Sequence, residues 1–191
     1  MPSRLLLLLP SLPPLPRGSL LSQPLGSLSQ LTGHPPAARY LWRLLRAGYD
    51  PLAQWDSPEG AHEASRFGMD PSRRARIAAG FSRIDSIGTV VRETVASDRT
   101  SKLLLRLSDG LEVEAVLIPP LPPTGGRVAA SARARTTLCI SSQVGCRQGC
   151  SFCATGRMGK LRDLSVDEIL MQAHHASRWA KSQDLPALSN V

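Results

Sequence analysis

All four cysteines of the chain lie in one short stretch, CISSQVGCRQGCSFC. They are Cys139, Cys146, Cys150 and Cys153, and the last three follow the spacing Cys-x-x-x-Cys-x-x-Cys. Thiolate sulfur is a soft ligand that favours zinc, copper(I) and iron–sulfur clusters over hard ions such as magnesium. The three closely spaced thiols therefore predict a centre that holds a soft metal or an iron–sulfur cluster.

Two kinds of centre compete for these thiols. A structural zinc ion usually takes four protein ligands as two well-separated pairs, whereas Cys139 lies seven residues before the triplet and falls on a predicted strand. Three thiolates can instead hold three irons of a 4Fe-4S cluster and leave the fourth iron open, and common ferredoxin spacings differ from this one. We favour the cluster with an open iron. A zinc site and a structural, unused cysteine are the alternatives.

The triplet lies between a predicted strand and a predicted helix. Residues 136–141, TTLCIS, are β-branched and apolar enough for a strand. After the cysteine loop, Ser165 and Glu168 have the spacing of a capping box ahead of the apolar Ile169 and Leu170. Strand, loop and helix make one βα unit, which places the chain in the α/β class.

Smaller elements are predicted before this unit. Residues 46–86 are predicted to be a short helical segment, in which Asp70 before Pro71 is a helix N-cap. Residues 87–119 contain alternating apolar and polar side chains and a tight turn, which predict a small three-stranded β-meander. Residues 120–135 are rich in proline, glycine and alanine, and this composition predicts a linker.

Residues 1–45 have a composition of their own. The chain has a net charge of +8, yet residues 1–49 contain no acidic residue. Leucine, serine and proline with scattered arginine are typical of an organellar transit peptide, so this stretch is predicted to be disordered and outside the fold. A chloroplast address is favoured over a mitochondrial one. The rival is a secretory signal, whose apolar core would end early, at Pro10.

Membrane insertion is not expected from the sequence. A transmembrane helix needs roughly 18 to 20 consecutive apolar residues. No run in the chain approaches that length, so no membrane span is predicted.

The residues around the triplet resemble a known family. Phe152 directly precedes the last cysteine, as in the signature of radical S-adenosylmethionine enzymes. The segments TLCISSQVGC and CSFCATGRMGKLRDLSVDEIL are similar to the RlmN/Cfr branch, whose members methylate carbon 2 or carbon 8 of an adenine in large-subunit ribosomal RNA. The resemblance is strong over residues 136–170 and fair over the meander. Asp163 is a departure, because the family usually carries asparagine there.

The resemblance implies a role for each site residue. Cys146, Cys150 and Cys153 would bind the 4Fe-4S cluster, whose open iron binds S-adenosyl-L-methionine, and the backbone around Phe152 would lie against the adenine of this cofactor. Cys139 would be a catalytic thiol that attacks the methylene bridge between the RNA and another enzyme cysteine, so that the methylated RNA is released. The implied partners are ribosomal RNA, with transfer RNA as a further candidate, and an electron donor such as ferredoxin or flavodoxin.

All charged residues in the segment that contains the cysteines are basic. Residues 127–162 contain seven basic residues and no acidic one. Such a stretch attracts phosphate, and it equally offsets the negative charge of a cluster and its thiolates. RNA contact is therefore favoured without being specific.

The resemblance also implies a fold, a (β/α)6 radical-SAM barrel of which the chain contains the first βα unit. The glycine-rich segment and the second cysteine of the family do not occur before Val191. We therefore expect a partial barrel preceded by the meander, in a truncated product. The alternatives to an enzyme are a non-catalytic remnant that binds RNA or a partner, and a zinc-binding module.

Overall fold

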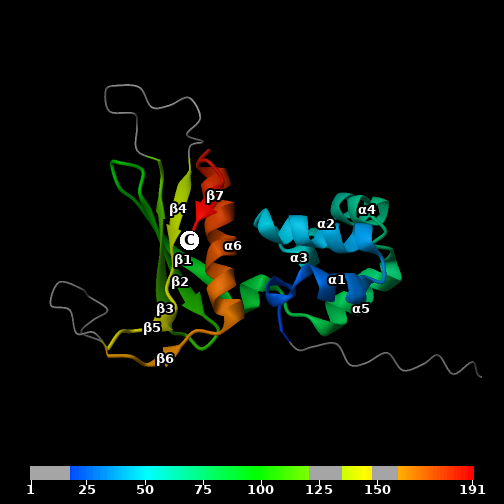
Figure 1. Cartoon of the computed structure of the whole chain (residues 1–191), viewed down its shortest axis with the longest axis horizontal. Coiled ribbons are helices and arrows are strands. Elements are labelled where there is room, and N and C mark those ends of the chain that lie inside the picture. Colours follow the sequence, from blue (N-terminus) through cyan, green and yellow to red (C-terminus); the bar gives the residue numbers. More distant parts are fainter. Residues whose placement is uncertain (1–17, 121–134, 148–158) are drawn as a thin grey trace, which may run out of the picture.

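The computed structural model describes residues 18–120, 135–147 and 159–191. Figure 1 shows a module of short helices on one side of a long helix, α6 (Val166–Ser182), and a sheet on its other side. Contacts between α6 and the strands, and between α6 and the helices, tie the two parts together. The described part of the chain contains no helix that is long and apolar enough to cross a membrane.

The helical module covers residues 18–87. Four of its helices begin with proline directly after a residue whose side chain accepts a hydrogen bond from the helix's first turn, which fixes where each helix starts. One of these N-caps is Asp70, as the sequence predicted. The elements are η1 (Leu20–Ser22), α1 (Leu25–Thr32), α2 (Pro35–Arg46), α3 (Pro51–Gln54), α4 (Pro58–Arg66), α5 (Pro71–Gly80) and η2 (Ile84–Ser86).

The expectation that residues 1–45 lie outside the fold is wrong for residues 18–45. Leu28 and Leu41 are completely buried in this stretch, and Ser19 donates a hydrogen bond through Oγ to Asp167 of α6 at 2.8 Å. The physical reason is the spacing of the apolar residues, which gives α2 one face that packs into the core. Residues 1–17 lie outside the described residues.

The sheet contains five strands in the order β1-β2-β3-β4-β7. β1 (Gly88–Val95), β2 (Ser101–Leu107) and β3 (Glu112–Ile118) form the antiparallel meander at the place where the alternation of side chains predicted it. β4 (Thr136–Cys139) pairs antiparallel with β3, and β7 (Leu188–Asn190) pairs parallel with β4. The meander and the βα unit are thus one sheet. The predicted linker lies almost wholly outside the described residues.

One face of the sheet is covered and the other is open. Leu103, Leu105, Leu117 and Leu138 are buried on the face that α6 covers. The alternate residues are exposed on the opposite face, where Lys102 pairs with Glu114 and Arg106 with Glu112. Since these described strands form an open sheet with β1 and β7 at its edges, they do not close a barrel.

Helix α6 is buried on two sides. It begins with the predicted capping box, in which Ser165 and Glu168 exchange hydrogen bonds. His175 contacts the backbone oxygen of Gly88 in β1 through Nε2 at 3.0 Å, while His174 lies in a cavity beside Leu45 of α2. Burial holds the pKa of His174 far below its ordinary value, at about 3, so this ring is neutral. Both histidines are thus buried within the fold.

Truncation of Leu41 tests whether residues 18–45 belong to the fold. We expect Leu41→Ala to lower the free energy of unfolding by about 2–5 kcal/mol, because it leaves a cavity in the core. Arg39→Ala on the exposed side of the same helix is the matched control, with an expected change within about 0.5 kcal/mol. Urea denaturation measures both. Equal stability of the two variants would place α2 outside the folded unit.

Candidate functional site

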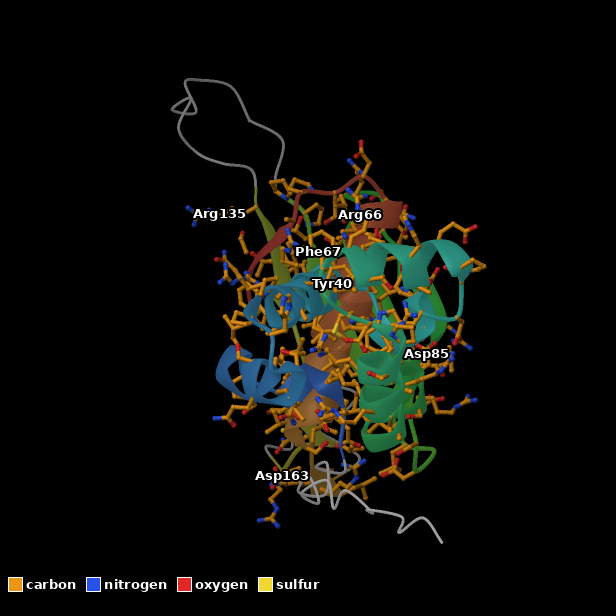
Figure 2. All side chains as sticks on the ribbon, turned by 90° about the vertical axis from the view of Figure 1, so that its right-hand side faces the viewer. Tyr40, Arg66, Phe67, Asp85, Arg135 and Asp163 are labelled. Atoms are coloured by element: carbon orange, nitrogen blue, oxygen red, sulfur yellow. The ribbon has the colours of Figure 1, made fainter. Side chains whose placement is uncertain are left out.

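Cys139 is the last residue of β4 and lies on the open face of the sheet. It is exposed and stands opposite Val116 of β3 in the antiparallel register. Arg135, just before β4, lies near the upper end of the molecule in Figure 2, and Asp163 lies at the lower end. The thiol marks the end of β4 from which the chain continues into the cysteine loop.

The chain after Cys139 is held by α6. Gln172 is completely buried, and its side-chain amide makes two hydrogen bonds to the same residue. Oε1 accepts from the backbone nitrogen of Ser141 at 2.9 Å, and Nε2 donates to the backbone oxygen of Ser141 at 2.9 Å. These bonds explain why β4 ends at Cys139, although the sequence predicted a strand over 136–141: the Ser141 backbone pairs with a helix side chain.

The cysteine loop is closed at its base by a short two-stranded ladder. β5 (Gln143–Val144) pairs antiparallel with β6 (Arg162–Asp163), and the Leu161 nitrogen donates to the Val144 oxygen at 2.9 Å. Gly145 has a φ of +73°, and a Cβ there would lie 1.8 Å from the backbone oxygen of Gly159. Only glycine fits this close approach of the two backbones.

Arg162 fastens this ladder to the rest of the fold. Its guanidinium donates to both carboxylate oxygens of Glu168, at 2.6 and 2.9 Å, and to Oδ2 of Asp109 in the β2–β3 turn, at 2.6 and 2.9 Å. The Arg162 hydrogen bonds hold the pKa of Glu168 at about 2, well below its ordinary value. The two carboxylates raise the pKa of Arg162, so all three groups stay charged at neutral pH.

The structure places two of the predicted site residues. Cys139 lies at the strand end, and Cys146 is half-buried at the start of the loop, next to Gly145. Cys150, Phe152 and Cys153 lie outside the described residues. The described residues contain no group of three or more His, Cys, Asp or Glu side chains that could hold a metal ion.

The loop fits an iron–sulfur cluster in its donor set and its closure. In the sequence the three thiols lie between Gly145 and Gly159, whose backbones meet at the loop base. Thiolates are the ligands that such clusters require. Within the described residues around the base, Asp163 is engaged with Lys160 at 2.6 Å and Glu168 with Arg162.

Several residues that shape the site were missed from the sequence. Arg162 was counted among basic residues that could attract RNA, but it is engaged within the fold. Glu168 was recognised only as a cap, and Gln172, Gly145 and Asp109 were assigned no role in the site. The glycines at the loop ends were a usable signal, because glycine is enriched where backbones approach closely. The ion pair with Asp109 spans 53 residues and leaves no local pattern.

Substitution of Gly145 tests the closed loop base. Gly145→Ala would place a methyl group against the Gly159 carbonyl, so we expect the ladder to open and the Leu161 amide to lose its protection from hydrogen exchange. Gly33→Ala is the control, because Gly33 also has a positive φ but open space around it. It should destabilise the module by about 1–2 kcal/mol without exposing Leu161. Unchanged Leu161 exchange in Gly145→Ala would contradict the close approach.

The Glu168–Arg162 pair should make the free energy of unfolding depend on pH in the acid range. Since the Glu168 pKa is lowered to about 2 in the folded state, its contribution is present above the unfolded pKa of about 4.5 and is lost as the pH falls toward 2. We expect Glu168→Gln to cost about 1–3 kcal/mol at pH 6, with the difference from wild type shrinking near pH 2.

Urea unfolding of the two proteins at pH 6, 4 and 2.5 measures this loss. Both proteins carry Asp109→Asn, because the pKa of Asp109 is also lowered and depends on the charge of Glu168 through the shared Arg162. A difference that stays constant from pH 6 to pH 2.5 would show that the charge of Glu168 is not what stabilises the fold.

Comparisons with known proteins point to one group of enzymes. The chain is 36% identical over 142 residues to a probable dual-specificity RNA methyltransferase RlmN of Salinibacter ruber (strain DSM 13855 / M31), a match that covers 74% of this chain and 37% of the relative. It is 49% identical over 98 residues to a dual-specificity RNA methyltransferase RlmN of Lawsonia intracellularis (strain PHE/MN1-00), covering 50% of this chain and 25% of the relative. No family model matches the chain.

A solved structure agrees with these relatives. The fold matches the crystal structure of a radical SAM methyltransferase from Sphaerobacter thermophilus with a TM-score of 0.55 and 30% sequence identity, over 90% of this chain and 45% of that one. The chain thus spans less than half the length of these proteins. Over part of its length, the chain is homologous to the RlmN radical SAM RNA methyltransferases.

Proposed function

We propose that this chain is the N-terminal part of a radical SAM methyltransferase that methylates carbon 2 of an adenine in large-subunit ribosomal RNA. One observation carries the proposal: the loop with the three thiols is closed by its own ladder and follows the end of the first strand of a β4–α6–β7 unit. In α/β folds, sites form at the carboxyl ends of parallel strands. The homology to RlmN enzymes supports the same reaction class.

Cys146, Cys150 and Cys153 are the residues that would hold a 4Fe-4S cluster. When bound, the cluster and S-adenosyl-L-methionine would supply the radical chemistry of the reaction, with an electron donor such as ferredoxin or flavodoxin. Residues of this chain fix the place of that chemistry. The ladder closes the base of the loop, and Arg162 ties the ladder to α6. The backbone near Phe152 would contact the cofactor's adenine.

Cys139 would act in product release. Its exposure on the open face leaves the thiol accessible to RNA, outside the closed loop that carries the other three. A thiolate there would form a sulfur–sulfur bond with the second enzyme cysteine, as the bond from that cysteine to the RNA-bound carbon breaks and the carbon takes up a proton. The methylated RNA then leaves, and a thiol reductant restores both cysteines.

A basic surface on the helical module would contact the RNA backbone. Arg39, Arg43 and Arg46 are exposed along α2 together with Trp42, and the Arg46 guanidinium lies 4.5 Å from the centre of the Trp42 ring. Basic side chains with an exposed aromatic ring suit phosphates and unstacked bases. The arginines of α5 suit this purpose less well, because Arg73, Arg74 and Arg76 are half-buried and each donates to a backbone carbonyl.

A second candidate function is RNA binding without catalysis. It is favoured by two observations. The exposed basic surface of α2 lies wholly within the described residues, whereas the described strands form an open sheet and not the closed barrel that the enzyme proposal implies. RNA binding that is undiminished when all four cysteines are replaced by serine, with no methyl transfer by wild type, would support this candidate.

Location in an organelle is a separate proposal. It rests on the composition of residues 1–17, which are rich in leucine and proline and contain Arg4 and Arg17 but no acidic residue, and a chloroplast remains favoured over a mitochondrion. Cleavage within α1 or α2 would remove buried leucines from the core. A leader would therefore be cleaved before η1, a point that N-terminal sequencing of the mature protein decides.

Cysteine variants test the enzyme proposal. After anaerobic reconstitution with iron and sulfide, we expect Cys150→Ala to lose the cluster and Cys139→Ala to keep it, because only the first removes a ligand. Iron analysis and electron paramagnetic resonance measure this difference. In a form that spans the full length of the relatives, Cys139→Ala should accumulate a covalent RNA adduct. Bound zinc with no iron would contradict the proposal. Equal iron loss in both variants would indicate that Cys139 is a cluster ligand.

A further inference from the structure

We propose that Gln172 of α6 is a positioning residue for Cys139, an assignment that rests on the proposed role of this thiol in releasing methylated RNA. Gln172 does not reach the sulfur. It holds the backbone of Ser141, two residues further along the chain, through the paired 2.9 Å hydrogen bonds to the Ser141 nitrogen and oxygen.

Cys139 needs such support because of its place in the sheet. Its pairing with Val116 is at the end of the β3–β4 register, and terminal strand pairs open more easily than internal ones. Ser141 closes this end from two sides. Its backbone is bound to α6, and its hydroxyl donates to the backbone oxygen of Glu114 in β3 at 2.9 Å. The thiol is exposed, but the chain that carries it is fixed.

An amide side chain is well suited to this task. Glutamine offers one acceptor and one donor group, which match the N–H and C=O of a single residue. Gln172 is completely buried, so an apolar side chain would leave two backbone groups of Ser141 without these partners. A glutamate carboxylate would accept from the Ser141 N–H but would face the Ser141 carbonyl without a proton to donate.

The same side of α6 also holds the chain that leaves the cysteine loop. Glu168 lies one turn before Gln172 and binds Arg162 of β6, while Gln172 Nε2 lies 3.3 Å from the backbone oxygen of Glu168. Two neighbouring polar side chains on one helix thereby hold two different chain segments, Gln172 the one at Ser141 and Glu168 the one at Arg162. Cys139 thus has a fixed position relative to the β5–β6 ladder at the base of the loop.

A first experiment tests the clamp in this chain. Amide hydrogen exchange at Ser141 should be at least about tenfold faster in Gln172→Leu than in wild type, because the amide loses its acceptor. His175→Leu is the matched control: it also removes a hydrogen bond from a buried α6 side chain to a strand backbone, but at β1. His175→Leu should leave Ser141 protected. Equal exchange rates at Ser141 in all three proteins would overturn the clamp.

A second experiment tests its use in release, in a form that spans the full length of the relatives. Gln172→Leu should keep wild-type iron content and RNA affinity but release methylated RNA about 10- to 100-fold more slowly, because misplacement of a reacting group costs rates of this order. Gln172→Glu keeps the side chain's size, so its rate of RNA release should fall between those of wild type and Gln172→Leu. It replaces the leucine variant in the experiment if that variant fails to fold. His175→Leu should release RNA at the wild-type rate.

The outcomes separate the two proposals. If Cys139→Ala accumulates the RNA adduct while Gln172→Leu and Gln172→Glu release RNA at the wild-type rate, the positioning role is wrong and the proposed function stands. If Cys139→Ala accumulates no adduct, the release function of the thiol is wrong, and the positioning role fails with it. Loss of iron in Gln172→Leu but not in His175→Leu would assign Gln172 to the cluster loop instead.

Discussion

The site depends on polar groups of α6 that are buried against the sheet. Glu168 and Gln172 are both shielded from water, and a buried carboxylate or amide is tolerated only when its hydrogen bonds are made. The partners that satisfy them are Arg162 on one side of the cysteine loop and Ser141 on the other. Packing α6 onto the sheet therefore also holds the strand end at Ser141 and the β5–β6 ladder at the base of the loop.

The local part of this arrangement could be read from the sequence. The capping box at Ser165 depends on two residues three positions apart, and the meander depends on alternation within each strand, so both patterns are visible in short windows. The cysteine spacing likewise indicates a soft metal centre. The long-range part could not be read. Arg162 binds Asp109, which lies in the turn between β2 and β3. No sequence pattern near Arg162 distinguishes it from an arginine that faces solvent.

The N-terminal helices show how composition can mislead. A stretch without acidic residues and rich in leucine satisfies the description of a transit peptide, yet the same leucines provide α1 and α2 with buried faces. What decides between the two is a partner surface, here supplied in part by α6 through Asp167 and the contacts to η1. That surface is more than a hundred residues away in the chain, and short helices of this kind gain most of their stability from such packing.

The order of the layers constrains how an RNA could use this protein. Figure 1 shows the helical module on one side of α6 and the sheet on the other, and Cys139 lies on the sheet face that points away from α6. The basic surface of α2 borders α6 and β7, where Trp42 and Arg46 share a cavity with His174 and Leu188, whereas the thiol lies on the opposite face of the sheet. A single stacked segment of RNA cannot lie flat against both. If both contacts form together, they must be made by different parts of a folded RNA that passes around an end of the molecule, which favours recognition of RNA shape over recognition of a short linear sequence.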